Sequence, residues 1–140
     1  MNWKKAKAAH LKLGRRGERL AVRLVKELGL TVLGRNYRVQ GGEIDIIALD
    51  GDTICFIEVK SRDNSRHQLL QRPSDAVGYH KKNRLRRAAK TYLCAKNYPS
   101  LMYRFDVIEV TFEGRRLKTL NWIPSFFKME QGESHGFEFE

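Results

Sequence analysis

The sequence predicts a single α/β domain in which helices flank a central mixed sheet, with the element order αβββαβ and an optional final strand. Three observations carry this prediction. Two segments with the helical spacing of apolar residues enclose three consecutive strand-like runs. The second and third runs are rich in β-branched residues and meet at a turn that contains glycine. Both faces of this predicted hairpin are apolar near the turn, as expected for central strands that are covered on two sides.

The first predicted helix follows a basic stretch. Residues 2–16 are rich in Lys and Arg, and we expect an N-terminal extension over residues 1–16 that is frayed or loosely helical. The helix after it ends at Gly29, because glycine readily adopts the left-handed conformation found just beyond helix ends. Residues 31–39 then form a predicted strand, and Gln40-Gly41-Gly42 a tight turn into the next strand. The predicted buried stripe of the helix consists of Leu20, Ala21, Leu24, Val25 and Leu28.

The second predicted helix follows a polar segment, residues 63–72, that we expect to be a loop. Pro73-Ser74-Asp75 offers a helix start with Ser74 as the N-cap, and the helix is expected to continue to Lys96. Lys81 falls on the apolar side of this helix, one turn before Leu85, where a lysine must reach solvent, an acid or a phosphate. The predicted buried side consists of Val77, Leu85, Ala88, Ala89, Tyr92 and Leu93.

The remaining residues predict two more strands and a tail. Residues 104–112 form the first strand, and a turn at Glu113-Gly114-Arg115 leads to an edge strand over residues 117–123. The predicted domain therefore covers residues 17–123. Residues 124–140 form a tail that is acidic from residue 130 and is expected to be flexible.

The composition limits the classes of function. The chain has 140 residues and a formal net charge of +11, and a basic domain of this size suggests a polyanionic partner, most simply nucleic acid. The two cysteines form neither a metal-binding pattern nor a disulfide framework, and the four histidines have no ligand or triad spacing. No apolar run approaches a membrane span and the N-terminus has no signal-peptide pattern, so we expect a cytoplasmic protein without a membrane partner.

The predicted hairpin places charged side chains on one face. If Gly51-Asp52 forms its loop, counting back along the two strands sets Asp45 opposite Glu58 and Glu43 opposite Lys60. Cross-strand partners have Cβ atoms about 4.5–5.5 Å apart, so the carboxylates of Asp45 and Glu58 could share one divalent cation. A loop shifted by one residue would change the register and still leave these side chains on the same face.

Two interpretations of this cluster are open. Glu-x-Lys on a strand is usually a solvated surface pattern. Apolar neighbours near the turn argue for partial burial instead, and Lys60 can neutralise only one acid, which leaves at least two without a counter-charge. Glu18 lies at the margin of the buried stripe of the first helix. It is either an exposed acid that favours the helix N-terminus or an acid directed at Asp45 and Glu58.

The chain carries an ordered set of motifs, which consists of Gly17-Glu18…Ala21, Arg35-Asn36-Tyr37-Arg38, Gly42-Glu43-Ile44-Asp45, Phe56-Ile57-Glu58-Val59-Lys60-Ser61-Arg62, Lys81…Arg84-Leu85 and Arg104-Phe105-Asp106-Val107. Together these motifs resemble those of the YraN-like family of small bacterial proteins. The family is similar to the restriction-endonuclease-like, PD-(D/E)xK nucleases, which carry an acid on the second strand of the core and Glu-x-Lys on the third. The resemblance implies a restriction-endonuclease-like fold with an αβββαβ core, although Ile44 stands at the position of the proline in the superfamily label.

The resemblance also implies metal-dependent hydrolysis of phosphodiester bonds, most simply in DNA and including branched or repair intermediates. Asp45 and Glu58 would hold Mg²⁺ or Mn²⁺ with the backbone carbonyl of Val59, because hard oxygen ligands suit these ions. Lys60 would orient the attacking water or offset charge. Glu18 could complete the metal shell, since Holliday-junction resolvases of the superfamily place a glutamate on the first helix. Candidate contacts to the phosphate backbone are Arg38, Arg62, Lys81 and Arg84.

Other functions fit the same residues. A nucleic-acid-binding protein on this fold that cleaves nothing would show a steep salt dependence of binding without metal-dependent turnover. An interaction module would use its basic face to meet an acidic protein or a membrane surface. If the chain cleaves, one cleft cuts one strand, so paired cuts would require a homodimer. Of the remaining acids, we expect Glu43 to pair with Lys60, and Asp106 to have a structural role in its strand.

Overall fold

The computed structural model describes residues 2–66, 78–97 and 102–127. The strands form one sheet in chain order, in which β3 and β4 are parallel and every other neighbouring pair is antiparallel. This confirms the predicted α/β class, with a mixed sheet, flanking helices and the optional last strand. The elements are α1 (Trp3–Glu27), β1 (Thr31–Val39), β2 (Gly42–Asp50), β3 (Thr53–Asp63), the short 3-10 helix η1 (Asn64–Arg66), α2 (Tyr79–Lys96), β4 (Met102–Glu113) and β5 (Arg116–Phe127).

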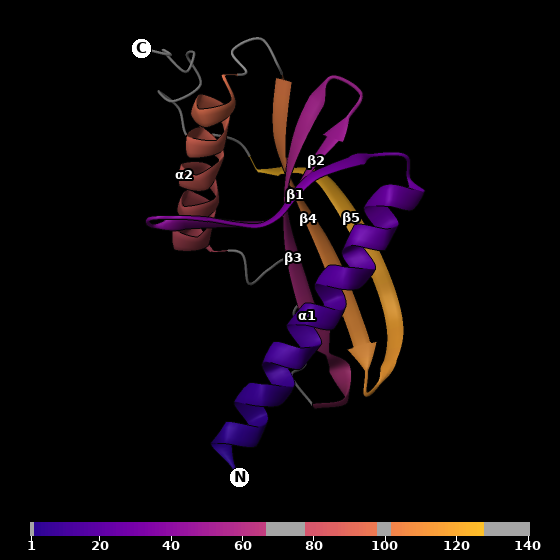
Figure 1. Cartoon of the computed structure of the whole chain (residues 1–140). Helices are drawn as coiled ribbons and strands as arrows, with labels where there is room; N and C mark the ends of the chain where they lie inside the picture. Colours follow the sequence, from indigo (N-terminus) through magenta and orange to yellow (C-terminus); the bar gives the residue numbers. More distant parts are fainter. Residues whose placement is uncertain (1, 67–77, 98–101, 128–140) are drawn as a thin grey trace.

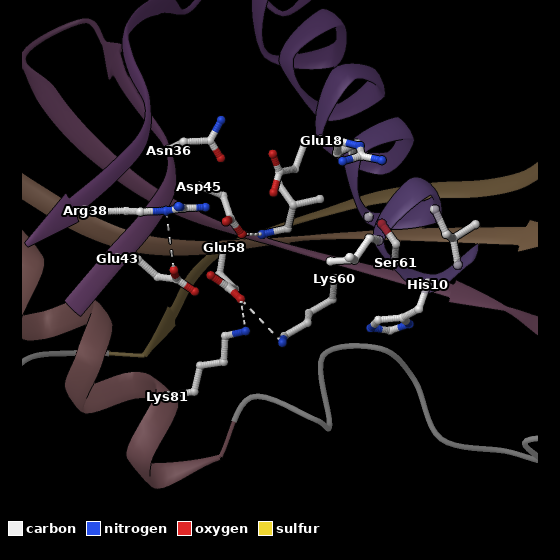
Figure 2. Close-up of a pocket in the computed structure, with 15 residues that line it drawn as sticks. His10, Glu18, Asn36, Arg38, Glu43, Asp45, Glu58, Lys60, Ser61 and Lys81 are labelled. Atoms are coloured by element: carbon white, nitrogen blue, oxygen red, sulfur yellow. Dashed lines mark hydrogen bonds and ion pairs between the residues drawn. The ribbon is translucent and has the colours of Figure 1, made fainter. Parts of the chain in front are cut away.

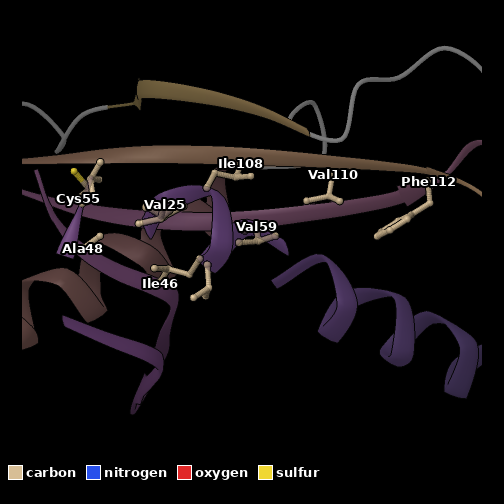
Figure 3. Close-up of a cluster of buried hydrophobic side chains, with 12 residues drawn as sticks. Val25, Ile46, Ala48, Cys55, Val59, Ile108, Val110 and Phe112 are labelled. Atoms are coloured by element: carbon tan, nitrogen blue, oxygen red, sulfur yellow. The ribbon is translucent and has the colours of Figure 1, made fainter. Parts of the chain in front are cut away.

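The two helices cover opposite faces of the sheet (Figure 1). Figure 3 shows the cluster on the α1 side, in which Val25 packs against the apolar residues of the central strands. On the α2 side, aromatic rings dominate, and the Phe56 ring meets those of Tyr92 and Phe105. The predicted buried residues of α2 that the structure describes are all buried: Leu85, Ala88, Ala89, Tyr92 and Leu93.

The β2–β3 hairpin has the predicted register. Asp50 pairs with Thr53, and the loop between them is Gly51-Asp52, with Gly51 in the left-handed conformation at φ 57°. Successive residues near the turn point alternately to the face of the sheet covered by α1 and to the face covered by α2, as predicted. Those on the α2 side include Ile47, Ile54 and Phe56, and those on the α1 side include Ala48, Cys55 and Ile57.

Strand β2 separates from β3 beyond the Ile46–Ile57 pair, where the ladder between them ends. Asn36 on β1 lies opposite Asp45, between two paired positions, and its φ of 50° is left-handed. A left-handed residue inside a strand bends the strand and increases its twist. In this region Ile44 packs in the α2 cluster, whereas strict alternation predicts that it shares the α1 side with Ile46. The predicted cross-strand pairs Asp45–Glu58 and Glu43–Lys60 therefore do not continue the ladder.

Helix α1 includes the basic N-terminal stretch, for which the sequence left a frayed and a loosely helical conformation open. It begins at Trp3, so residues 3–16 are helical rather than frayed. This stretch is rich in Ala, Lys and Leu, which favour helices, and the Asn2 side chain caps it by accepting a 3.1 Å hydrogen bond from the Lys4 N–H. At the other end, Leu28 is the C-cap residue and is 53% exposed, so its predicted place in the buried stripe is wrong.

Two other predicted boundaries differ from the structure. Helix α2 begins at Tyr79, with Gly78 at its N-cap. Ser74 and Val77 lie outside the described residues. Strand β5 continues through Pro124 to Phe127, because an edge strand has no neighbour that needs the missing proline N–H. Neither of the two described helices combines the length and apolarity that a membrane span requires.

Candidate functional site

A cleft of about 700 Å³ lies where β2 separates from β3. Its walls come from α1, the first three strands and the start of α2, and Figure 2 shows their polar side chains directed into a common space. The cleft therefore gathers residues that are far apart in the sequence. The polar side chains that line it belong to His10, Arg15, Glu18, Asn36, Arg38, Glu43, Asp45, Glu58, Lys60, Ser61 and Lys81.

Asp45 is held in place by the separation of the strands. Its Oδ2 atom accepts a 2.8 Å hydrogen bond from the backbone N–H of Val59. In an uninterrupted antiparallel ladder, a backbone carbonyl of β2 would accept from this strand. The Asp45 carboxyl takes that place, so the same distortion that breaks the ladder fixes the acid beside Glu58.

Glu58 is the most buried acid of the cleft, with a side chain only 2% exposed. Its Oε1 atom lies 2.7 Å from Lys81 Nζ and 3.4 Å from Lys60 Nζ. Its Oε2 atom is buried and has no hydrogen-bond partner among the described residues. A buried carboxylate oxygen without a partner is costly, so this atom is set up to meet a proton or a cation.

Glu18 reaches the cleft because α1 lies very close to β3. A Cβ atom added at Gly17 would overlap Ser61 Oγ, so a larger residue there would require the Ser61 side chain or the helix to shift. In Figure 2 the Asp45 carboxyl lies between those of Glu18 and Glu58. The structure thus favours the second interpretation of Glu18, in which it is directed at the other two acids.

Crowding of these carboxyl groups changes their acidity. Burial, together with the negative charge of Glu58, raises the pKa of Asp45 to about 8. Burial also raises the pKa of Glu18, an effect that the charge of Arg35 opposes and that of Glu58 reinforces. The cleft therefore binds protons more readily than isolated carboxylates do, and a cation would relieve the same repulsion.

The two lysines of the cleft differ in their protonation. Burial lowers the pKa of Lys60, and the adjacent Lys81 contributes to this lowering. Burial also acts to lower the pKa of Lys81, but its short ion pair with Glu58 outweighs that effect and raises the pKa. Lys81 is therefore the main counter-charge of Glu58, and Lys60 is the lysine that gives up its proton more readily.

Lys81 depends on the close packing of α2 on β2. A Cβ atom added at Gly42 would lie 2.5 Å from the backbone oxygen of Arg84 and 3.0 Å from the backbone nitrogen of Ala88. Only glycine allows the helix to approach the strand this closely. Of the three partners that the sequence offers Lys81, which are solvent, an acid and a phosphate, the structure supplies an acid.

Glu43 does not pair with Lys60, and that prediction is wrong. Its Oε2 atom lies 4.0 Å from Arg38 Nε and 3.9 Å from Arg84 Nη2. The reason is that β2 has already turned away from β3 at this point. The side chains of Arg38 and Arg84 are 76% and 54% exposed, so these two candidate phosphate contacts lie at the rim of the cleft.

Asp106 has the predicted structural role. It is fully buried, and its carboxylate accepts from Arg104 Nε, from Trp122 Nε1 at 3.0 Å and from the backbone N–H of Ser125 at 2.9 Å. These bonds hold the irregular end of β5 against β4. Arg104 also donates to Asp50 at 3.0 Å, which ties this network to the hairpin turn.

Sequence reasoning missed Asn36 and His10, which both line the cleft. A signal existed for Asn36, because asparagine tolerates the left-handed conformation and interrupts an otherwise strand-like run. No comparable signal existed for His10, since its contribution depends on α1 continuing as a helix to Trp3. The remaining candidate, Arg62, lines an adjoining pocket instead of the cleft.

The donors of the cleft suit a hard divalent cation. Asp45 and Glu58 present carboxylate oxygens, and the buried Glu58 Oε2 has no partner among the described residues. The described residues contain no group of three or more His, Cys, Asp or Glu side chains already placed to hold a metal ion. Asp45 and Glu58 could together provide two carboxylate ligands, and a third from Glu18 would require its side chain to move.

Comparison with known proteins identifies one matching family. The model of the uncharacterised protein family UPF0102 matches residues 17–110. A UPF0102 protein of Clostridium kluyveri is 43% identical over 113 residues, which cover 81% of this chain and 86% of that protein. One of Syntrophus aciditrophicus is 42% identical, with 79% of this chain and 87% of that protein covered. The relative in Chlorobium phaeobacteroides is 47% identical over 98 residues, 70% of this chain and 75% of that protein.

Proposed function

The chain belongs to the UPF0102 family, and we propose that it is a metal-dependent nuclease that hydrolyses phosphodiester bonds in DNA. The observation that carries this proposal is the buried Oε2 atom of Glu58, which lies beside the Asp45 carboxyl and has no hydrogen-bond partner in the part of the chain that the structure describes. Lys81 and Lys60 pair with only the other oxygen of Glu58, so a bound cation would satisfy an atom that the lysines leave without a contact among the described residues. A cation held next to basic residues is a suitable arrangement for a phosphate ester.

The order of elements supports the same proposal. An acid on β2 and Glu-x-Lys on β3 of an αβββαβ core correspond to the arrangement implied by the resemblance to PD-(D/E)xK nucleases. We therefore assign this chain a restriction-endonuclease-like core within the α/β class. Branched, nicked and single-stranded DNA are the substrates to test first.

Each side chain of the cleft has a separate task in this proposal. Asp45 and Glu58 would hold Mg²⁺ or Mn²⁺ with the Val59 carbonyl, and Glu18 would join them after a side-chain movement. When bound, the cation supplies positive charge that lowers the pKa of a water molecule and stabilises the developing phosphorane. Lys60, whose pKa burial lowers, is placed to orient the attacking water and exchange a proton with it.

Lys81 serves two states of the cleft. Without a cation it neutralises Glu58 through their 2.7 Å contact. Once another positive charge takes over that task, its ammonium is available for a phosphate oxygen of the substrate. Arg38 and Arg84, at the exposed rim, would contact more distant phosphates.

The test is cleavage of branched, nicked and single-stranded DNA with Mg²⁺ or Mn²⁺. We expect Asp45→Asn to abolish cleavage, because it removes a ligand charge and retains the acceptor for the Val59 N–H. Glu43→Gln is the matched control, since this acid lines the same cleft but pairs with arginines, and it should retain most of the activity. Equal cleavage by wild type and Asp45→Asn on every substrate would remove the assigned role.

A second candidate is a nucleic-acid-binding protein without catalysis. The ion pairs of Glu58 with Lys81 and Lys60 favour it, because they neutralise the buried acid without any metal. Calorimetric titration of Mn²⁺ into wild type and Glu58→Gln separates the two. The nuclease requires binding that Glu58→Gln weakens strongly, whereas the binding protein gives no such difference.

A further inference from the structure

A second pocket, of about 580 Å³, adjoins the acid-lined cleft. The two share His10, Leu13 and Ser61 in their walls, so they are neighbours beneath α1. The second pocket lies between α1, the end of β3 and the β4–β5 turn. Its charged lining residues are Lys12, Arg16, Arg62, Asp63 and Arg115.

The lining of this pocket is predominantly positive. Lys12, Arg16 and Arg115 form no ion pair with any residue in the described part of the chain. The one acid, Asp63, uses its Oδ1 atom to accept from the Ser65 N–H at 2.9 Å and from the Gly114 N–H at 3.1 Å. Asp63 therefore ties the end of β3 to the β4–β5 turn, and the pocket has an excess of cationic groups.

Arg16 is already oriented. Its guanidinium group lies 4.7 Å from the centre of the Phe112 ring, and Nη1 donates a 2.5 Å hydrogen bond to the carbonyl oxygen of Arg115. These contacts fix the plane of the guanidinium while leaving other donors on the same group. A planar, fixed arginine fork is well suited to phosphate, because it can donate two parallel hydrogen bonds.

We propose that this second pocket binds a phosphate group of the nucleic-acid strand whose neighbouring phosphate occupies the acid-lined cleft. The inference rests on the proposed nuclease function and extends it to how the strand is held. The strand passes beneath α1, from the acids at Asp45 and Glu58 to the cations at Arg16 and Arg115. The ligand is a phosphate in either case, and it is either an internal phosphodiester or the terminal phosphate of a strand end.

The test measures binding of fluorescent single-stranded DNA in EDTA, where no metal-dependent cleavage occurs, at several salt concentrations. The double variant Lys12→Gln/Arg115→Gln removes two exposed cations of the pocket. The matched control, Arg19→Gln/Arg23→Gln, removes two exposed cations of α1 that line neither pocket. Both variants lose the same charge, so a difference between them reports a local contact and not the general field of the protein.

We expect the pocket variant to lose about tenfold in affinity, and the slope of log K against log salt to fall by about 0.7, the value of one single-strand phosphate contact. The control should stay within about twofold of wild type. Oligonucleotides with and without terminal phosphates distinguish the two sources. A selective loss seen only with a terminal phosphate assigns the pocket to strand ends, and a loss seen with both assigns it to internal phosphates.

Equal losses in the two variants, or unchanged affinity in the pocket variant, would overturn the inference. So would the absence of measurable DNA binding by wild type. Failure of the pocket proposal can be distinguished from failure of the nuclease proposal. Cleavage that depends on Asp45, combined with equal losses in the two double variants, keeps the nuclease and removes the pocket. A selective loss of DNA binding in the pocket variant, without any cleavage by wild type, keeps the phosphate pocket and removes the nuclease.

Discussion

Replacing Asp45 by asparagine should stabilise the metal-free protein at alkaline pH. The pKa of Asp45 is raised from 3.8 to about 8, first by burial and then by the charge of Glu58. Between these two values the folded chain binds one more proton at this site than the unfolded chain does. The free energy of unfolding of wild type therefore falls as the pH rises through this window. Asparagine resembles the protonated acid at every pH, and its side-chain oxygen can still accept from the Val59 N–H.

The size of the effect follows from the same window. Each pH unit corresponds to about 1.36 kcal/mol, so the upper limit between ~pH 5 and ~pH 8 is about 4 kcal/mol. Water can enter the open cleft and screen the charge, and side chains can relax, which reduces the penalty. We therefore expect Asp45→Asn to gain about 2 kcal/mol relative to wild type between these pH values.

The assay is urea unfolding of wild type and Asp45→Asn in EDTA, at ~pH 5 and ~pH 8.5. Asp52→Asn, in the exposed hairpin turn, is the control and should give the same difference at both pH values. Adding Mg²⁺ at ten times its dissociation constant should then stabilise wild type by about 1.4 kcal/mol and the variant by much less. A pH-independent difference between wild type and Asp45→Asn would refute the reasoning on burial and repulsion.

Three other predictions follow from the packing of the strands. Gly42→Ala should lower the free energy of unfolding by about 1–3 kcal/mol in urea unfolding, because the new Cβ would meet the backbone of α2. The matched change Gly34→Ala meets nothing within 4 Å and should be far milder. Asn36→Ala should cost about 1–2 kcal/mol, measured in the same way, whereas Asn36→Gly should not, because the position is left-handed at φ 50°. A thiol reagent should modify exposed Cys94 in the native protein and reach Cys55, whose pKa burial raises to about 12, only after unfolding; rapid modification of both would contradict the assigned burial.

The sequence was sufficient to predict the hairpin because its turn and its apolar alternation are local features. The Gly51-Asp52 loop sets the register, and this register brings Asp45 and Glu58 close to each other on adjacent strands. Lys81 was also predictable in part, since a lysine on the apolar side of a helix needs a partner, and that partner is Glu58. These predictions needed only periodicities that one segment carries by itself.

The separation of β2 from β3 was not predictable, because no periodicity within either strand marks the point where the ladder ends. On β1 the left-handed Asn36 lies opposite Asp45, and this relation becomes visible only when the two strands are paired. The close contacts at two glycines were also not predictable from a single segment. Gly17 and Gly42 match motifs of the family, but their use as contact points for α1 and α2 becomes visible only when both surfaces are in place.

The acids of the cleft are better explained by a ligand than by the fold. A buried charge stabilises a protein little even when it is paired, and well-packed apolar side chains in its place are often neutral or more stable. Here Glu58 has one oxygen paired with two lysines and the other without a partner among the described residues, while Asp45 is held beside it by a backbone N–H. In the proposed nuclease the lysines are the resident counter-charge that a metal ion would replace, and this exchange would couple metal binding, substrate binding and stability.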